Sequence, residues 1–189
     1  MKPTINAVIL AGGFSRRMGT DKAGVLHPVS GEPLLTHQLD LIAKLSAGRV
    51  FVSARNDQEL PPFSEDIGRI NDAGEHGPLG GIAATLAEAP DHHLLVVPVD
   101  LPLLNQQVLE RLITGIDSPE SGTVAKSPEG LEPLVAIFPP PALSAMHHAI
   151  QQDHLGVKAL ILGPLKPLMK SVEFTDHAPF GNWNSPSDI

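Results

Sequence analysis

The chain has 189 residues, a formal net charge of −8 and no cysteine. The acidic balance argues against a general nucleic-acid-binding protein, which carries a basic face. The missing cysteine excludes disulfides, thiolate catalysis and cysteine zinc sites. The length suits a single domain over residues 1–189, no apolar run is long enough to cross a bilayer, and no signal peptide is evident, so we expect a cytoplasmic enzyme.

In the first half of the chain, short apolar runs alternate with helical patterns. The predicted strands are residues 7–10, 49–53, 68–70 and 94–99, and the predicted helices begin near Pro33 and Pro78. The run at 94–99 is apolar on both faces, which is typical of a strand in the centre of a sheet.

The second half of the chain continues this alternation. Asn105 is a good N-cap for the next helix, and further helices are predicted at 141–152 and 155–162. Strands are predicted at 123–125, 133–138 and 171–174. Alternating strands and helices predict an α/β, Rossmann-like three-layer fold with a mostly parallel central sheet and helices on both faces.

The most informative segment, LAGGFSRRMGTDK, spans residues 10–22 and follows the first strand. Adjacent glycines, Gly12 and Gly13, allow a sharp turn that presents backbone N–H groups to an anion. Arg17 and Lys22 add the mobile positive charge that a polyphosphate requires. The spacing fits neither the P-loop nor the dinucleotide fingerprint. The segment therefore predicts a nucleoside triphosphate site, with an ordinary glycine-rich connection as the alternative.

Two acidic residues come directly after predicted strands. Asp100 follows the strand at 94–99, and Asp72 follows the strand at 68–70. Ligands of open α/β sheets bind outside the carboxyl ends of the strands. A carboxylate there must be hydrated, paired or bound to metal, and Mg²⁺ is the natural partner beside a triphosphate. The alternatives are that Asp100 caps the turn before Pro102 and that Asp72 belongs to a plain turn.

These motifs resemble the molybdenum cofactor guanylyltransferase family, which has a nucleotide-diphospho-sugar transferase-like fold. The matching segments are residues 10–22, Gly77-Pro78-Leu79 with Gly81-Ile82, Asp100 with Pro102, Glu132-Pro133-Leu134, and residues 180–186 with their Asn-x-Asn-x-Pro motif. The segments occur in the family's order over nearly the whole chain.

The resemblance implies transfer of GMP from GTP to the phosphate of molybdopterin, the molybdenum cofactor, with Mg²⁺ as cofactor and pyrophosphate as product. It assigns Arg17 and Lys22 to the phosphates, Asp100 to the metal and Asp72 to the guanine nucleoside. Asp21 is expected to orient Lys22 or to cap the following segment. The other residues that it places at the nucleotide or the acceptor are Leu10, Ala11, Gly12, Gly13, Ser53, Asn182 and Asn184.

Two departures from the family pattern bear on this assignment. Ser53 stands where the family often has an asparagine, and Lys158 lies where an arginine is expected on the pterin side. The alternatives are a CTP-using molybdenum cofactor cytidylyltransferase, another nucleotidyltransferase, and a non-catalytic carrier of GTP or cofactor. Molybdoenzymes and cofactor-delivery proteins are candidate partners, and we expect neither nucleic acid nor membrane as a partner.

Overall fold

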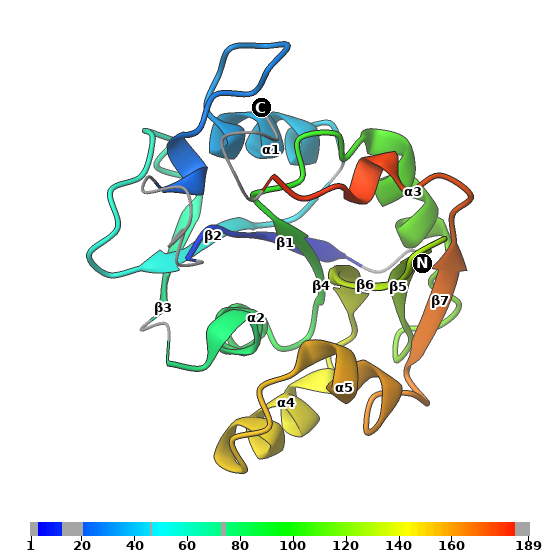
Figure 1. Ribbon diagram of the computed structural model, residues 1–189. Helices are drawn as coiled ribbons and strands as arrows, with labels where there is room; N and C mark the ends of the chain where they lie inside the picture. The colour runs from blue at the N-terminus through cyan, green and yellow to red at the C-terminus, as the bar shows by residue number, and fades with distance from the viewer. Residues whose placement is uncertain (1–3, 13–20, 46, 73–74, 184–189) are drawn as a thin grey trace.

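The computed structural model describes residues 4–12, 21–45, 47–72 and 75–183, without the side chain of Asp72. Its strands are β1 (Ile5–Leu10), β2 (Val50–Arg55), β3 (Gly68–Asp72), β4 (His93–Pro98), β5 (Gly122–Ser127), β6 (Gly130–Phe138) and β7 (Met169–Glu173). They form one sheet in the order β3-β2-β1-β4-β6-β5-β7, as Figure 1 shows.

The half of the sheet formed by β3, β2, β1 and β4 is entirely parallel. Alternate residues of β1 face opposite sides: Ala7 and Ile9 belong to one hydrophobic cluster, and Val8 belongs to the other. Both faces are therefore buried, as expected for parallel strands. Because these strands run in the same direction, the segments that follow them emerge at one edge of the sheet.

The other half is mixed, because β6 runs antiparallel to both β4 and β5, whereas β7 is parallel to β5. The β5–β6 hairpin turns at Gly130, whose φ of +132° suits glycine. β6 starts three residues before the predicted strand at 133–138. Its register with β5 shifts between Val124 and Ala125, opposite the part of β6 that contains Pro133. Proline has no N–H to donate and is tolerated at such an irregularity, so it does not end the strand.

Helices cover both faces of the sheet (Figure 1). On one face lie α1 (Leu34–Ala43) and α3 (Gln106–Thr114), and on the other lie α2 (Gly77–Ala87), α4 (Ala142–Gln151) and α5 (Val157–Leu162). Two short 3₁₀ turns, η1 (Lys22–Gly24) and η2 (Ala178–Phe180), complete the described elements. None of the helices in the described residues is long and apolar enough to cross a bilayer.

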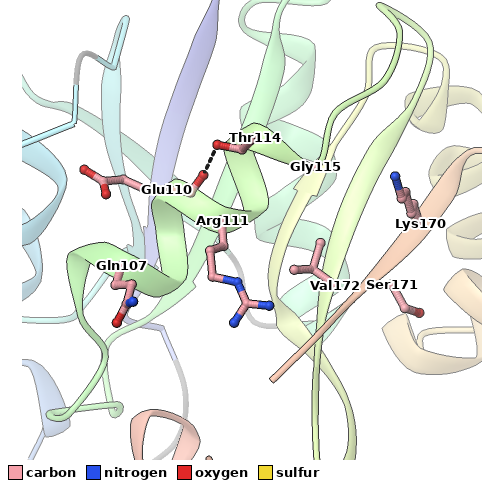
Figure 2. A pocket seen from close by; sticks show the side chains of 8 residues that line it. All are labelled: Gln107, Glu110, Arg111, Thr114, Gly115, Lys170, Ser171 and Val172. Atoms are coloured by element: carbon pink, nitrogen blue, oxygen red, sulfur yellow. Dashed lines mark hydrogen bonds between the residues drawn. The ribbon is translucent and has the colours of Figure 1, made fainter. Parts of the chain in front are cut away.

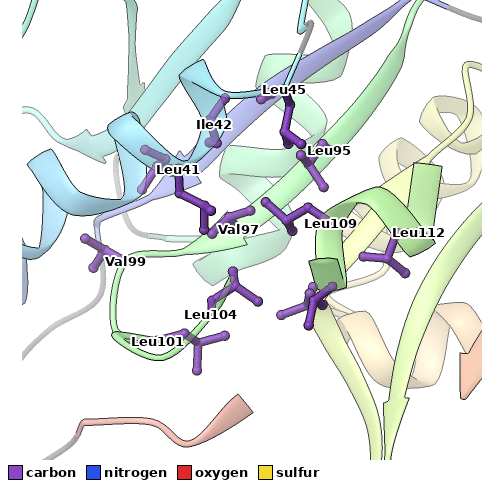
Figure 3. Packing of buried hydrophobic residues seen from close by; sticks show 14 of the residues in the cluster. Leu41, Ile42, Leu45, Leu95, Val97, Val99, Leu101, Leu104, Leu109 and Leu112 are labelled. Carbon is purple, nitrogen blue, oxygen red and sulfur yellow. The ribbon is translucent and has the colours of Figure 1, made fainter. Parts of the chain in front are cut away.

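The cluster beneath α1 and α3 fixes the position of β4. Figure 3 shows Leu95 and Val97 of β4 among side chains of both helices, including Ile42 and Leu109. All four residues are fully buried or nearly so. The predicted cap of α3 is confirmed, because Asn105 Oδ1 accepts the Val108 N–H at 3.2 Å. These contacts hold the carboxyl end of β4, and with it Asp100, at a defined place on the sheet edge.

Candidate active site

Lys22 and Asp100 form an ion pair at the edge where the parallel strands end. Lys22 Nζ donates to Asp100 Oδ2 at 2.7 Å, although the residues are 78 positions apart. Their side chains are 18% and 20% exposed, so the pair is partly buried and still reachable by a ligand. Partial burial strengthens the interaction of such charges with each other and with a charged ligand. The structure thus brings together the lysine and the carboxylate that the sequence singled out.

The loop that carries Asp100 is fixed from three directions. The carbonyls of residues 100–102 accept, in order, the Trp183 N–H at 3.0 Å, Gln38 Nε2 at 2.7 Å and His27 Nε2 at 3.0 Å. Gln38 and His27 are buried. Buried hydrogen bonds from separate elements leave a backbone little freedom. The sequence analysis missed both side chains, because each belongs to a distant segment with no motif of its own.

His27 also organises its own turn. Its Nδ1 accepts the N–H groups of Val29 at 3.3 Å and Ser30 at 3.2 Å, which places the ring hydrogen on Nε2 for the bond to the loop after β4. The ring stacks on His37 with centroids 4.0 Å apart. Burial, followed by the neighbouring His27 and Lys44, lowers the pKa of His37. The turn after η1 and the loop after β4 are therefore joined through one imidazole.

The start of the glycine-rich segment continues the pairing of the sheet. The Leu10 carbonyl accepts the Val99 N–H at 3.1 Å, and the Ala11 N–H donates to the Ser53 carbonyl at 2.8 Å. The Ala11 N–H is thus already bonded within the sheet, and the placement of Ala11 at the nucleotide stays a prediction. Gly12 is half-buried at the point where the chain leaves the sheet.

Ser53 lies behind this segment. Its side chain is 1% exposed, and a Cβ placed on Gly81 of α2 would collide with Ser53 Oγ. The hydroxyl therefore packs against the helix, and the expectation that this side chain contacts the nucleotide is not supported. The small residue at position 81 of the Gly-Pro-Leu-x-Gly motif is required by packing on β2. Gly77 of the same motif has a φ of +54°, which glycine adopts without strain.

Of the two roles expected for Asp21, capping of the following segment by its side chain is not observed. Asp21 occupies the N-cap position of η1 without a side-chain cap bond. Its carboxylate accepts from Arg55 and Gln58 instead, two residues at the end of β2 that the sequence analysis missed. The sequence offered no signal for them beyond their polar character at a strand end.

Asp72 ends β3 and pairs in register with Arg55 of β2. Two strands, β2 and β1, separate β3 from β4. A spacing of about 4.8 Å between strands places the ends of β3 and β4 roughly 14 Å apart. The backbone of Asp72 thus ends a strand at the same edge of the sheet as Asp100, and its contact with the nucleoside stays a prediction.

The C-terminal segment reaches the same edge. Trp183 donates its N–H to the Asp100 carbonyl, and the preceding Asn182 is exposed. Three other predicted site residues, Gly13, Arg17 and Asn184, lie outside the described residues.

A second polar cluster lies on the mixed half of the sheet, around the Glu132-Pro133 motif. Ser127 Oγ donates to Glu132 Oε1 at 2.7 Å, and His177 Nε2 lies 3.4 Å from Glu129 Oε2. Neither here nor elsewhere in the described residues do three or more histidine, aspartate or glutamate side chains form a group suited to hold a metal. A metal at Asp100 would therefore need further ligands from the bound molecule or from water.

An open pocket lies between α3 and β7, as Figure 2 shows. Its lining residues are Gln107, Glu110, Arg111, Thr114, Gly115, Lys170, Ser171 and Val172. Arg111 Nη2 donates to the Glu173 carbonyl at 2.6 Å, and the guanidinium lies 4.3 Å from the centre of the Phe174 ring. The pocket contains none of the predicted site residues, and its arginine serves to attach the C-terminal segment to α3.

With this geometry established, comparison with known proteins identifies the family. The MobA-like NTP transferase domain matches residues 7–166. The chain belongs to this family. A relative from Shewanella loihica, named molybdenum cofactor guanylyltransferase, is 33% identical over 144 residues, which are 76% of this chain and 72% of that protein. A relative of the same name from Shewanella sediminis is 32% identical over 77% of this chain and 74% of its own.

Solved structures agree on the fold. The molybdopterin-guanine dinucleotide biosynthesis protein A of Archaeoglobus fulgidus superposes with a TM-score of 0.69 at 23% identity, over 97% of this chain and 94% of its own. The 4-diphosphocytidyl-2C-methyl-D-erythritol synthase of Anaerococcus prevotii gives a TM-score of 0.75 at 11% identity, over 100% and 95%. The predicted Rossmann-like fold and the family resemblance are confirmed. Because guanylyl- and cytidylyl-transferring proteins share this fold, the fold does not select the base.

Proposed function

We propose that this member of the MobA-like family transfers GMP from GTP to the phosphate of molybdopterin, forming the guanine dinucleotide cofactor and pyrophosphate. The observation that carries the proposal is the Lys22–Asp100 pair, which lies beside the glycine-rich segment at the carboxyl edge of the parallel strands. The names of the relatives from Shewanella supply the guanylyl transfer and the acceptor. A cytoplasmic location is part of the proposal, since a chain without cysteine has no need of an oxidising compartment.

Lys22 is proposed to neutralise the outer phosphates. An ammonium group has three donors, so Lys22 can exchange its bond to Asp100 for bonds to phosphate oxygens when GTP enters. Catalysis of phosphoryl and nucleotidyl transfer consists mainly of alignment and charge neutralisation. A cation at the departing pyrophosphate stabilises the charge that develops there. Arg17 is proposed to share this task.

Asp100 is proposed to hold Mg²⁺ together with the nucleotide. A single, partly exposed carboxylate fits this ion, because Mg²⁺ in such sites takes one or two carboxylates, phosphate oxygens and water. Bound there, the ion supplies charge neutralisation at the phosphates. Since the described residues offer Mg²⁺ no larger group of acidic ligands, metal binding should depend on the nucleotide.

The remaining assignments follow the order of elements along the edge. The backbone of residues 10–12 and Asp72 are proposed to contact the nucleoside, and Asn182, which precedes the Trp183 that bonds to the Asp100 carbonyl, is proposed to face the acceptor. Asn184 and Gly13 keep the roles that the resemblance implies. The second candidate function is the same transfer from CTP, which the shared fold of cytidylyl-transferring neighbours keeps open.

Equilibrium binding of GTP, CTP, ATP and UTP, with and without Mg²⁺, tests the proposal, and pyrophosphate release with molybdopterin follows turnover. We expect a preference for GTP that requires Mg²⁺. Asp100→Asn should lower turnover by about 100-fold or more, as losing one stabilising group at a reacting centre does. Glu129→Gln, an equal charge change on the mixed half of the sheet, should leave GTP binding unchanged.

Three results would change these conclusions. A preference for CTP would assign the sister activity. Full Mg²⁺-dependent turnover by Asp100→Asn would reject the metal assignment. A folded protein that binds none of the four nucleotides would reject the proposed function.

A further inference from the structure

Two side chains at the end of β2 join the two ends of the glycine-rich segment. Gln58 Nε2 donates to the Ala11 carbonyl at 2.9 Å and to Asp21 Oδ1 at 2.8 Å. Arg55 donates through Nη1 to the Gly12 carbonyl at 3.1 Å and through Nη2 to Asp21 Oδ2 at 3.4 Å. Each side chain therefore bonds to the backbone just after β1 and to the Asp21 side chain just before η1.

The two side chains are themselves held in place. Gln58 is 3% exposed, and its Oε1 accepts the Arg55 N–H at 3.2 Å. Arg69 of β3 donates to the carbonyls of Arg55 at 2.8 Å and Gln58 at 3.0 Å. The turn between these residues is thus fastened to β3 from outside. Because both polar groups of the Gln58 side chain are engaged, it has little rotational freedom, which suits it to fix another segment.

The charges in this arrangement also matter for an anionic ligand. Both oxygens of the Asp21 carboxylate accept hydrogen bonds, and one of the donors is a guanidinium. The negative charge next to Lys22 is therefore paired with Arg55, whose Nε also lies 3.5 Å from the exposed carboxylate of Asp57. An unbalanced carboxylate at this position would repel a triphosphate.

We propose that Asp21, Arg55 and Gln58 form a clip that positions the backbone of Ala11 and Gly12, together with Lys22, for the phosphates of the nucleotide. The three are positioning residues. They act through the backbone of Ala11 and Gly12, and through Asp21, which directly precedes Lys22 in the chain. This inference rests on the proposed function for the identity of the ligand. The clip itself is a property of the free protein and can be measured there.

Gln58→Glu is the decisive variant. A carboxylate at position 58 has the same size, cannot donate to Ala11 or Asp21, and places like charges together. The N–H groups of Gly24 and Val25 bond to the carbonyls of Asp21 and Lys22. We expect their amide exchange to accelerate at least about tenfold, since the bonds of Gln58 to Ala11 and Asp21 are lost. GTP affinity should fall at least roughly tenfold on the same basis, and GMP affinity should fall less, because the clip positions Lys22 for the outer phosphates.

The control and the rescue separate a clip from a general loss of stability. Gln152→Glu makes the same charge change at an exposed position of the described chain and should alter neither readout. Adding Asp21→Asn to Gln58→Glu exchanges donor and acceptor, so an amide at position 21 can donate to position 58 and Arg55 can pair with the new carboxylate. This double variant should regain the slow exchange at Gly24 and Val25 and part of the GTP affinity.

The results distinguish the clip from the proposed function. Unchanged amide exchange in Gln58→Glu would overturn the clip. If the wild-type protein binds GTP, unchanged GTP affinity of Gln58→Glu would overturn it as well. Failure of the wild-type protein to bind GTP would reject the proposed function, while the exchange rates still decide whether the clip exists. If Gln58→Glu does not fold, Arg55→Lys takes its place, because an ammonium group cannot span Gly12 and Asp21 as the planar guanidinium does.

Discussion

Each half of the sheet has a lysine–carboxylate pair in it or beside it. The two pairs differ in their surroundings more than in the distance between nitrogen and oxygen. Lys22 and Asp100, on the parallel half, are 2.7 Å apart with side chains 18% and 20% exposed. Lys126 Nζ and Glu173 Oε1, on the neighbouring strands β5 and β7 of the mixed half, are 3.1 Å apart with side chains 46% and 68% exposed. An exposed pair contributes about 0–1 kcal/mol to stability. Distance alone therefore does not mark a functional pair.

The anchoring of the backbone separates the two pairs more clearly. Three buried or backbone donors hold the carbonyls of residues 100–102, and the clip holds Asp21 next to Lys22. Around the second pair, the carbonyl of Glu173 accepts from the exposed Arg111 Nη2 at 2.6 Å, and Glu173 ends β7 at the edge of the sheet. Strands β5 and β7 run parallel to each other, so both ion pairs lie at carboxyl ends of strands, and they differ in burial rather than in strand direction. The Lys22–Asp100 pair is thus distinguished by the buried side chains of distant segments that fix its surroundings.

The largest expected difference between the halves comes from removing each lysine. Lys22→Ala should lower turnover about 100-fold, since it removes a cation from the developing charge on pyrophosphate. It should lower GTP affinity more than GMP affinity, because the outer phosphates are its proposed partners. Lys126→Ala should change neither value. Steady-state kinetics and nucleotide titration of both variants measure the effect, and equal losses of GTP and GMP affinity would point to a structural role for Lys22.

An intermediate effect is expected where α2 packs on β2. Gly81→Ala introduces a Cβ into the space of Ser53 Oγ and should destabilise the protein by about 1–3 kcal/mol, as overpacking does. In a Ser53→Ala background the same change should cost little, because the colliding oxygen is gone. Gly156→Ala, whose Cβ would meet only the Ala159 Cβ at 3.6 Å, is the control on the other half. Denaturant unfolding measures all four variants, and additive effects of the Gly81 and Ser53 changes would contradict this account.

The smallest expected effect concerns pH and the opposite edge of the sheet. His93 begins β4, is 2% exposed, and donates from Nε2 to the Ser121 carbonyl at 2.9 Å. Burial lowers its pKa below the ordinary 6.5, so the unfolded chain binds the proton more readily than the folded one. Stability is then complete above about pH 6.5 and falls as the pH drops through 6.5 toward the lower folded pKa.

Replacing the titrating group should flatten this dependence. His93→Gln should reduce the loss of unfolding free energy between pH 7.5 and 5.5, while His147→Gln, at an exposed position of α4, should not. GTP affinity of the folded protein should be unaffected by His93→Gln, since this end of β4 lies opposite Asp100. An unchanged slope in His93→Gln would show that burial of this ring does not control the acid sensitivity.

Local chemistry was sufficient for much of the fold and for the central pair of the site. Periodicity and apolar runs predicted β1, β4 and the cap of α3 by Asn105, because these depend on neighbours along the chain. Lys22 and Asp100 were predicted from motifs that follow strands, and the structure brings them together.

Only the tertiary structure decided which segments meet. The direction of β6, its early start before Pro133, and the burial of Ser53 under Gly81 depend on pairing and packing with remote elements. Gln58, Gln38 and His27 act on partners 47, 63 and 75 residues away. Such side chains leave no periodic or motif signal. Each hydrogen bond depends on where a remote segment lies in space, and it requires a particular residue at only one position of the sequence.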